Sequence, residues 1–140
     1  MSPSRFFFPV VVLLLSTSFL GCGSNPPALV PVQGKVSYRG IPLSTGTVVF
    51  IPDSSRGNTG PLAKADVGPD GRYTLRTDDK LGVLPGWYRV TVAAFIMPSA
   101  GDSFRMPESL LPDHYRDPDM SGITCEVRAG QENTLDFNLE

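Results

Sequence analysis

The chain of 140 residues divides by composition into an apolar N-terminus and a longer, mixed body. It has 12 Lys and Arg against 14 Asp and Glu, a net charge of −2, which becomes −3 if Arg5 is removed with a leader. Basic residues this few and scattered exclude an electrostatic nucleic-acid surface. The 14 Gly and 14 Pro disfavour a helical bundle. The body suits one domain.

The N-terminus has the order of residues found in a secretory signal. Arg5 precedes the apolar run 6–20, and small residues follow around Cys22. The run is 15 residues long and contains Pro9, whereas about 20 apolar residues are needed to cross a bilayer core as a helix. We therefore predict a signal peptide over 1–21 rather than a permanent transmembrane helix.

The segment Phe19-Leu20-Gly21-Cys22 resembles the lipobox of bacterial lipoproteins, in which a small residue precedes a cysteine that is lipidated and becomes the new N-terminus. Phe19 and Leu20 depart from the residues usual at those positions. The resemblance implies acyl chains such as palmitate on Cys22, which would hold the protein on a membrane because each buried CH₂ contributes about 0.8 kcal/mol.

Two further expectations depend on Cys22. Gly23 stands where enterobacterial lipoproteins retained in the inner membrane have Asp, so the resemblance favours a lipid-anchored place in the cell envelope at the outer membrane. The alternative is an ordinary secreted protein in which Cys22 is free or paired with Cys125.

Residues 22–31 contain three prolines in the last seven positions and are predicted to form a stiff tether.

The body alternates apolar and polar residues with a period of two, which is typical of strands with one buried face. Turn residues such as Asp70-Gly71 and Pro85-Gly86 separate the apolar runs. We predict an all-β fold over 32–140, a seven-stranded antiparallel β-sandwich. The expected strands are 32–38, 48–51, 62–67, 72–76, 87–96, 123–128 and 134–139.

The alternation also predicts which side chains form the core. We expect the core to contain Val36, Phe50, Tyr73, Leu75, Tyr88, Val90, Val92, Ile123, Val127, Leu135, Phe137 and Leu139. In the strand 87–96, Ala94 and Ile96 share the inward face, whereas Trp87 and Arg89 lie on the other.

Five segments resemble the carboxypeptidase regulatory-like family: 32–36 (VQGKV), 40–43 (GIPL), 48–52 (VVFIP), 70–75 (DGRYTL) and 86–92 (GWYRVTV). The tail resembles small bacterial lipoproteins of this group. The resemblance covers about residues 31–140 and implies a transthyretin-like, or prealbumin-type, sandwich of Ig-like architecture. The matching residues are determinants of strands and turns, so they imply a fold rather than an activity.

No set of residues in the sequence is arranged for catalysis. His114 is the only histidine, whereas a zinc hydrolase needs at least two with a carboxylate, and no serine lies in a nucleophile elbow. Cys125 lies in a predicted strand and is expected to be a buried apolar group rather than a nucleophile. We therefore expect no enzyme activity and no cofactor.

Three acidic residues in the insertion 97–121 are weak calcium candidates. Asp113, Asp117 and Asp119 lie within seven positions, and calcium prefers several oxygen ligands. Their spacing is not that of an EF-hand, so the favoured interpretation is a solvated loop without a metal.

Trp87 and Arg89 are candidate ligand contacts. An outward-facing aromatic beside a guanidinium could stack on a sugar or on a partner side chain. The alternative is that Trp87 packs under the insertion 97–121 with Phe104 and Met106.

These features predict a non-enzymatic, membrane-anchored lipoprotein that acts as a structural or binding module at the cell envelope. Its expected partners are the membrane, through the N-terminal lipid, and an envelope protein or a glycan. The competing hypothesis is a carbohydrate- or peptide-binding module that uses Trp87, Arg89 and the 97–121 loop.

Overall fold

The computed structural model describes residues 23, 27–102 and 104–140, so the predicted signal peptide and Cys22 lie outside the described residues. The described part is all-β, with two single turns of 3₁₀ helix, η1 (Ser54–Arg56) and η2 (Asp113–Arg116). Within that part, no helix has the length and apolar character required to cross a membrane.

The larger sheet has the strand order β11-β8-β3-β4-β6-β7, and all its pairs are antiparallel. Its strands are β3 (Thr47–Pro52), β4 (Ala63–Asp66), β6 (Arg76–Thr77), β7 (Lys80–Leu81), β8 (Gly86–Ala93) and β11 (Thr124–Val127). The long strand β8 lies between β3 and β11. It contributes side chains both to the core and to the outer face of this sheet.

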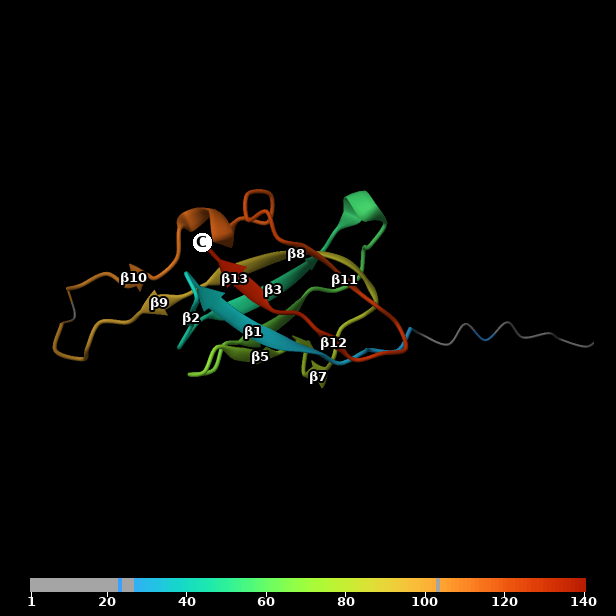
Figure 1. Ribbon diagram of the computed structural model, residues 1–140, viewed down its shortest axis with the longest axis horizontal. Coiled ribbons are helices and arrows are strands. Elements are labelled where there is room, and N and C mark those ends of the chain that lie inside the picture. The colour runs from blue at the N-terminus through green and yellow to red at the C-terminus, as the bar shows by residue number, and fades with distance from the viewer. Residues whose placement is uncertain (1–22, 24–26, 103) are drawn as a thin grey trace, which may run out of the picture.

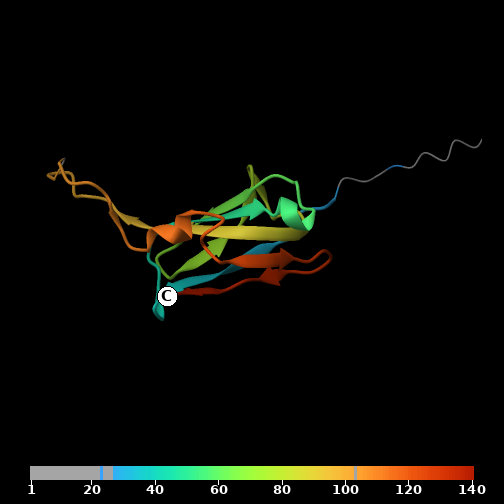
Figure 2. The ribbon, with the colours of Figure 1, turned by 90° about the horizontal axis from the view of Figure 1, so that it is seen from above.

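The smaller sheet is built around β1 and packs face to face with the larger one (Figure 1 and Figure 2). Its strands are β1 (Val32–Tyr38), β2 (Ile41–Pro42), β5 (Arg72–Thr74), β12 (Asn133–Thr134) and β13 (Phe137–Leu139). β1 is antiparallel to β2 and β5 but parallel to β12 and β13. The expectation of a wholly antiparallel arrangement is wrong at this point, because the first and last strands of the body run in the same direction.

The strands are shorter and more numerous than the seven expected, because the expected strands 72–76, 87–96 and 134–139 are each divided and because β2, β7 and β10 were not expected. The strand 72–76 changes sheets: β5 pairs with β1, and after Leu75, whose amide donates to the Val32 carbonyl over 2.9 Å, β6 pairs with β4. The strand 134–139 is interrupted where the Asp136 carboxylate accepts the Lys35 amide over 2.8 Å in place of a backbone carbonyl. Alternation of side chains does not reveal such breaks.

The interior between the sheets holds most of the expected core. Nine of the twelve expected side chains are buried, whereas Ile123, Leu135 and Phe137 are only partly buried. The ring of Phe50 is fully buried and lies 5.8 Å from the Tyr88 ring and 6.1 Å from that of Phe137. The sandwich-like body is therefore held by one aromatic-centred core.

At Gly34, the Tyr73 side chain and the Leu135 backbone meet across β1. The Tyr73 hydroxyl donates to the Leu135 carbonyl over 2.5 Å, which links β5 to the segment between β12 and β13. A Cβ at position 34 would overlap the Leu135 carbonyl and would come within 2.9 Å of the Tyr73 hydroxyl. Glycine is therefore required here for space rather than for backbone conformation.

The chain leaves the body at Phe95 and forms a projecting hairpin, which we call the arm (95–109). β9 (Phe95–Ile96) pairs antiparallel with β10 (Glu108–Ser109). Both ribbon views place the arm at the end of the body opposite to the one where residues 27–31 lead into β1. Ile96 is 52% exposed, so its expected place on the inward face of the strand 87–96 is wrong, because the strand has already left the body there.

Candidate functional site

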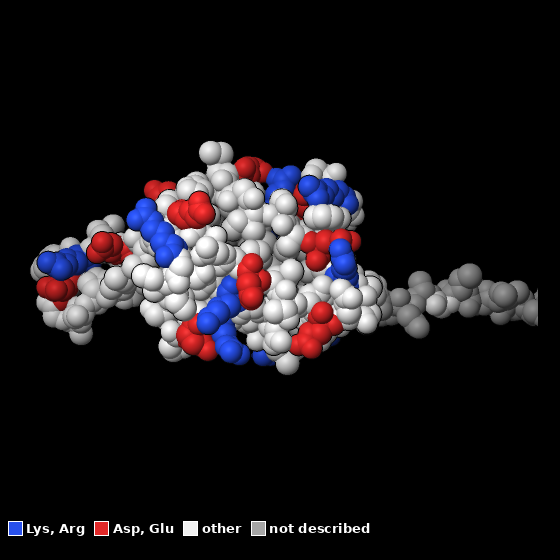
Figure 3. Space-filling view, viewed as in Figure 1, with Lys and Arg blue, Asp and Glu red and all other residues white. Residues whose placement is uncertain are grey.

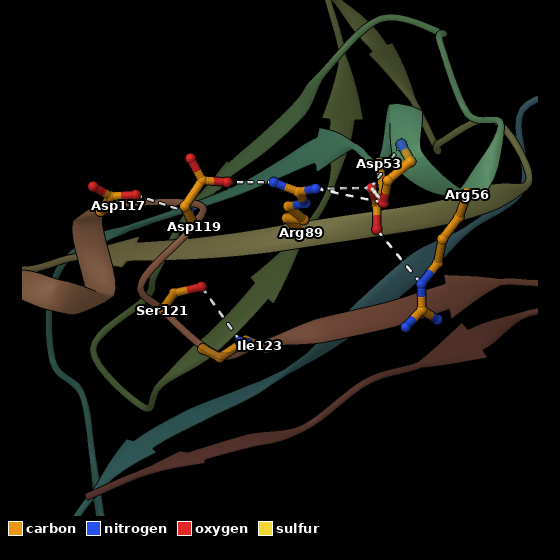
Figure 4. A network of polar contacts seen from close by, with 8 residues as sticks. Asp53, Arg56, Arg89, Asp117, Asp119, Ser121 and Ile123 are labelled. Carbon is orange, nitrogen blue, oxygen red and sulfur yellow. Dashed lines mark hydrogen bonds and ion pairs between the residues drawn. The ribbon is translucent and has the colours of Figure 1, made fainter.

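Arg89 is the centre of a polar network on the outer face of β8 (Figure 4). Its Nη2 donates to Asp53 Oδ1 over 3.2 Å, and its Nη1 donates to Asp119. Asp53 follows β3, whereas Asp119 lies between η2 and β11. One guanidinium therefore links three segments that are far apart in the sequence.

Asp53 is the buried member of this network, with 3% of its surface exposed. It caps η1, where its Oδ1 accepts the Ser55 amide over 3.1 Å and the Ser55 hydroxyl over 2.6 Å. The Ser55 hydroxyl and the charge of Arg89 lower the pKa of the Asp53 carboxyl, against the opposing effect of burial. Asp53 is therefore ionised at neutral pH and holds both η1 and Arg89.

Trp87 is half-buried and packs against η1. The Arg56 guanidinium lies 4.1 Å from the centroid of the Trp87 ring, and Arg56 Nε is 3.6 Å from Asp53 Oδ2. Phe104 and Met106 are 104% and 86% exposed, so they do not cover the indole as expected. The ring is held instead by a cation–π contact whose cation is itself fixed by Asp53.

Trp87 and Arg89 line different depressions. Trp87 borders an open depression of about 530 Å³ beside β11 with Glu126, Arg128 and Gln131. Arg89 borders a second one, of about 360 Å³, with Asp119. The structure does not gather the two predicted ligand contacts into one pocket, and Arg89 is engaged in ion pairs.

The three calcium candidates face different partners. Asp113 pairs with Arg116 within η2, Asp117 accepts the Asp119 amide over 2.8 Å, and Asp119 pairs with Arg89. Across 27–102 and 104–140, no group of three or more His, Cys, Asp or Glu side chains is placed to hold a metal ion. The arrangement is that of turns and ion pairs.

His114 and Cys125 are the remaining candidates for a catalytic base and a nucleophile, and neither is part of a catalytic arrangement in the described residues. The His114 ring lies 4.1 Å from that of Tyr115, which is buried and donates from its hydroxyl to the Glu140 carbonyl over 3.0 Å. Cys125 is a free thiol, and burial raises its pKa to about 12. A thiol with this pKa is protonated at neutral pH and is a poor nucleophile.

Asp53 and Arg56 were not identified from the sequence. The signal that could have found them is the run Asp53-Ser54-Ser55 directly after an apolar strand, because Asp is a preferred N-cap residue whose side chain accepts a backbone amide two or three positions on. The pairing with Arg89 depends on the register of β3 against β8, which places Ile51 opposite Arg89.

Comparison of the chain with protein-family models, with curated proteins and with solved structures found no match.

Proposed function

We propose that this protein is a non-enzymatic lipoprotein, anchored through Cys22 to the outer membrane of the cell envelope, whose body is a structural or binding module. The finer assignment of the body, a seven-stranded transthyretin-like sandwich of the carboxypeptidase regulatory-like family, is part of this proposal. The observation that carries it is the lipobox-like segment ending at Cys22, followed by the proline-rich residues 25–31 and then by a folded body.

The polar groups of the body support a scaffold role. Every buried side-chain nitrogen and oxygen in the described residues has a hydrogen-bond partner. Asp53 and Asp119 are both paired with Arg89, Asp53 is paired with Arg56 as well, and the Cys125 thiol is held protonated. Lys and Arg are interspersed with Asp and Glu over the face seen in Figure 3, so that face has no extended region of one sign.

The anchor is tested by acyl labelling, with the two cysteines as a matched pair. Cells producing the wild-type chain, Cys22→Ser or Cys125→Ser are fed an alkyne analogue of palmitate and then fractionated. We expect label and outer-membrane association in the wild type and in Cys125→Ser, and loss of both in Cys22→Ser. A wild-type chain that is unlabelled and soluble would overturn the proposal.

A carbohydrate- or peptide-binding role is the second candidate, and the placement of Trp87 favours it. The indole is fixed by Arg56 and borders a depression with Glu126 and Gln131, and an aromatic ring beside planar polar groups suits a sugar. Arg89 belongs to this hypothesis only through its support of η1 by way of Asp53.

Trp87 is the only tryptophan, so its fluorescence reports this depression directly. Titration of the full chain with peptidoglycan fragments and with a panel of oligosaccharides should give a saturable change in emission if the role is correct. Glu126→Gln should weaken that response, whereas Glu108→Gln on the arm should not. An unchanged emission across the panel contradicts this second role and leaves the anchor proposal as it was.

A further inference from the structure

The larger sheet ends in a free edge at β11, which among the described strands pairs with β8 alone (Figure 1). The Val90 amide donates to the Ile123 carbonyl over 2.9 Å, so the backbone groups of Ile123 and of every second residue after it face β8. The amides and carbonyls of Thr124 and Glu126 therefore face away from the sheet, and no group of the described residues bonds to them. Such a row of unpaired groups is a template for another strand.

The free part of this edge is limited at both ends. The buried Asn133 side chain accepts the Arg128 amide over 2.9 Å and donates to the Arg128 carbonyl over 3.1 Å, so the backbone of Arg128 is already satisfied. At the other end, Gly122 has a positive φ of 70°, which interrupts the extended conformation. An added strand must therefore pair with Thr124 and Glu126.

The apolar interior of the body also reaches solvent along this edge. The partly buried side chains packed against the core include Ile123, Cys125, Leu135 and Phe137, all from the segment 123–139 that forms this side of the body. Open depressions of about 530 Å³ and about 360 Å³ border β11 at Cys125 and at Ile123, so neighbouring segments leave the edge accessible. A strand added here would have room and would cover apolar surface.

A second β11 satisfies this edge in one antiparallel register. With a two-fold axis at Cys125, Thr124 of each copy lies opposite Glu126 of the other, and these two residues exchange both backbone bonds. All the free groups of both edges are then paired. A shift of two residues in either direction leaves one of these residues without a bonded partner, and one of the two shifts places the Glu126 carboxylates opposite each other.

The backbone alone would accept any extended strand, but the side chains of β11 favour a second copy. On the inward face, Cys125 meets its own counterpart and Ile123 meets Val127, so apolar groups meet apolar groups. Arg128 comes to the end of the other copy where Asp119 borders the depression beside Ile123. The side chains of Arg128 and Asp119 are 69% and 74% exposed, so both charges are accessible for an ion pair between the copies.

We propose that the protein forms a two-fold dimer in which β11 pairs with β11 of a second copy, in the register that places Thr124 opposite Glu126. The larger sheets of the two copies then form one continuous sheet. The pairing lies in the plane of this sheet, whereas Trp87 lies on its outer face. The dimer therefore goes beyond the functions proposed above and rests neither on the anchor nor on a bound sugar.

The mass of the protein tests the dimer. The full chain is purified in detergent, and light scattering after gel filtration gives the mass of its protein part. We expect twice the mass of one chain for the wild type and for Thr124→Val, which keeps the backbone groups. Thr124→Pro, which removes the outward amide, should have the mass of one chain. Proline is tolerated at an edge position whose amide faces solvent, so circular dichroism should show that this variant is folded.

Disulfide trapping tests the register, and it decides the proposal if Thr124→Pro does not fold. In a Cys125→Ser background, Thr124→Cys together with Glu126→Cys places thiols of the two copies at opposite positions, with a Cα distance of about 5.5 Å that suits a disulfide. Mild oxidation should link most of this variant as a dimer on a non-reducing gel. Thr124→Cys alone in the same background should stay unlinked, because it lies opposite Glu126.

Each other result overturns the proposal. A wild-type chain with the mass of one copy has no such dimer. A folded Thr124→Pro that stays dimeric assigns the contact to another surface. No linkage in the double cysteine variant, or equal linkage in Thr124→Cys alone, contradicts the register. Acylation is measured separately on the same preparations, so a failure of the anchor is not mistaken for a failure of the dimer.

Discussion

The body and the arm differ in where they place side chains of the same kind. In the body, Phe50 is fully buried among other aromatic rings, whereas Phe104 on the arm is fully exposed. The body also satisfies its buried polar groups internally, while the hydrogen bonds at the arm tip are local. The difference shows that the stability of the fold comes from the sandwich-like body and that the arm is free to serve interactions.

Replacing a phenylalanine in each region should give the largest contrast. Phe50→Ala removes a fully buried ring and should lower the free energy of unfolding by about 3 to 5 kcal/mol. Phe104→Ala should change it by less than about 0.5 kcal/mol, because that ring packs against nothing in the body. Urea unfolding followed by circular dichroism measures both, and equal losses would show that the arm is part of the core.

Two glycines provide the next contrast. Gly34→Ala forces a methyl group against the Leu135 carbonyl and the Tyr73 hydroxyl, and should cost about 3 kcal/mol. Gly101→Ala, on the arm, meets no atom within 4 Å and should be neutral. The same unfolding experiment applies, and a neutral Gly34→Ala would mean that the link across β1 is dispensable.

Acid should remove a stabilising contribution of Asp53 in the body, whereas the acidic residues of the arm should contribute little to the pH dependence of stability. The folded state lowers the pKa of this carboxyl below its ordinary value of 3.8, so its stabilising contribution is complete above that pH and is lost as the pH falls through the folded pKa. Asp53→Asn should be less stable than the wild type at pH 7, and the gap should narrow below pH 3.8.

The measurement is the urea midpoint between pH 2 and pH 7, with Asp102→Asn on the arm as the control. The control should follow the wild-type curve throughout this range. A gap between Asp53→Asn and the wild type that is independent of pH would contradict the role given to the ionised carboxylate.

The smallest expected effect lies at the turn between β1 and β2. Arg39 and Gly40 both have positive φ, 51° and 80°, in a two-residue hairpin loop. Asn tolerates this conformation better than Arg, so Arg39→Asn should stabilise the body by about 1 kcal/mol. Thermal unfolding should show a higher Tm, and an unchanged Tm would indicate that Arg39 compensates through its contact with the Tyr38 ring, whose centroid is 5.1 Å away.

The sequence predicts the body better than its connections. Alternation identifies the buried face of β8 and most of the core, since the longer strands of the body present one face to the interior. It does not show that Leu75 carries the chain from one sheet to the other, or that Asp136 interrupts the last strand, because both depend on partners about 40 or 100 residues away. These contacts are set by tertiary structure rather than by local pattern.

The candidate site is less accessible to sequence reasoning than the core. Alternation places Trp87 on the outward face of its strand, but the contact of Trp87 with Arg56 depends on how η1 folds back along β8. Arg89 could be expected on the same face, whereas its pairing with Asp119 depends on the path of the loop before β11. The two-residue alternation of apolar and polar residues predicts that a side chain points outward. It does not predict which residue that side chain contacts.

The parallel pairing of β1 with β13 affects how the protein reaches its folded state. Val36 lies opposite Phe137, so the small sheet cannot close until almost the whole chain has been synthesised. Contacts of such long range delay folding and leave apolar segments without partners while the ribosome is still at work. Until its last strand emerges, a nascent chain of this kind therefore has β1 without its β13 partner and remains incompletely folded.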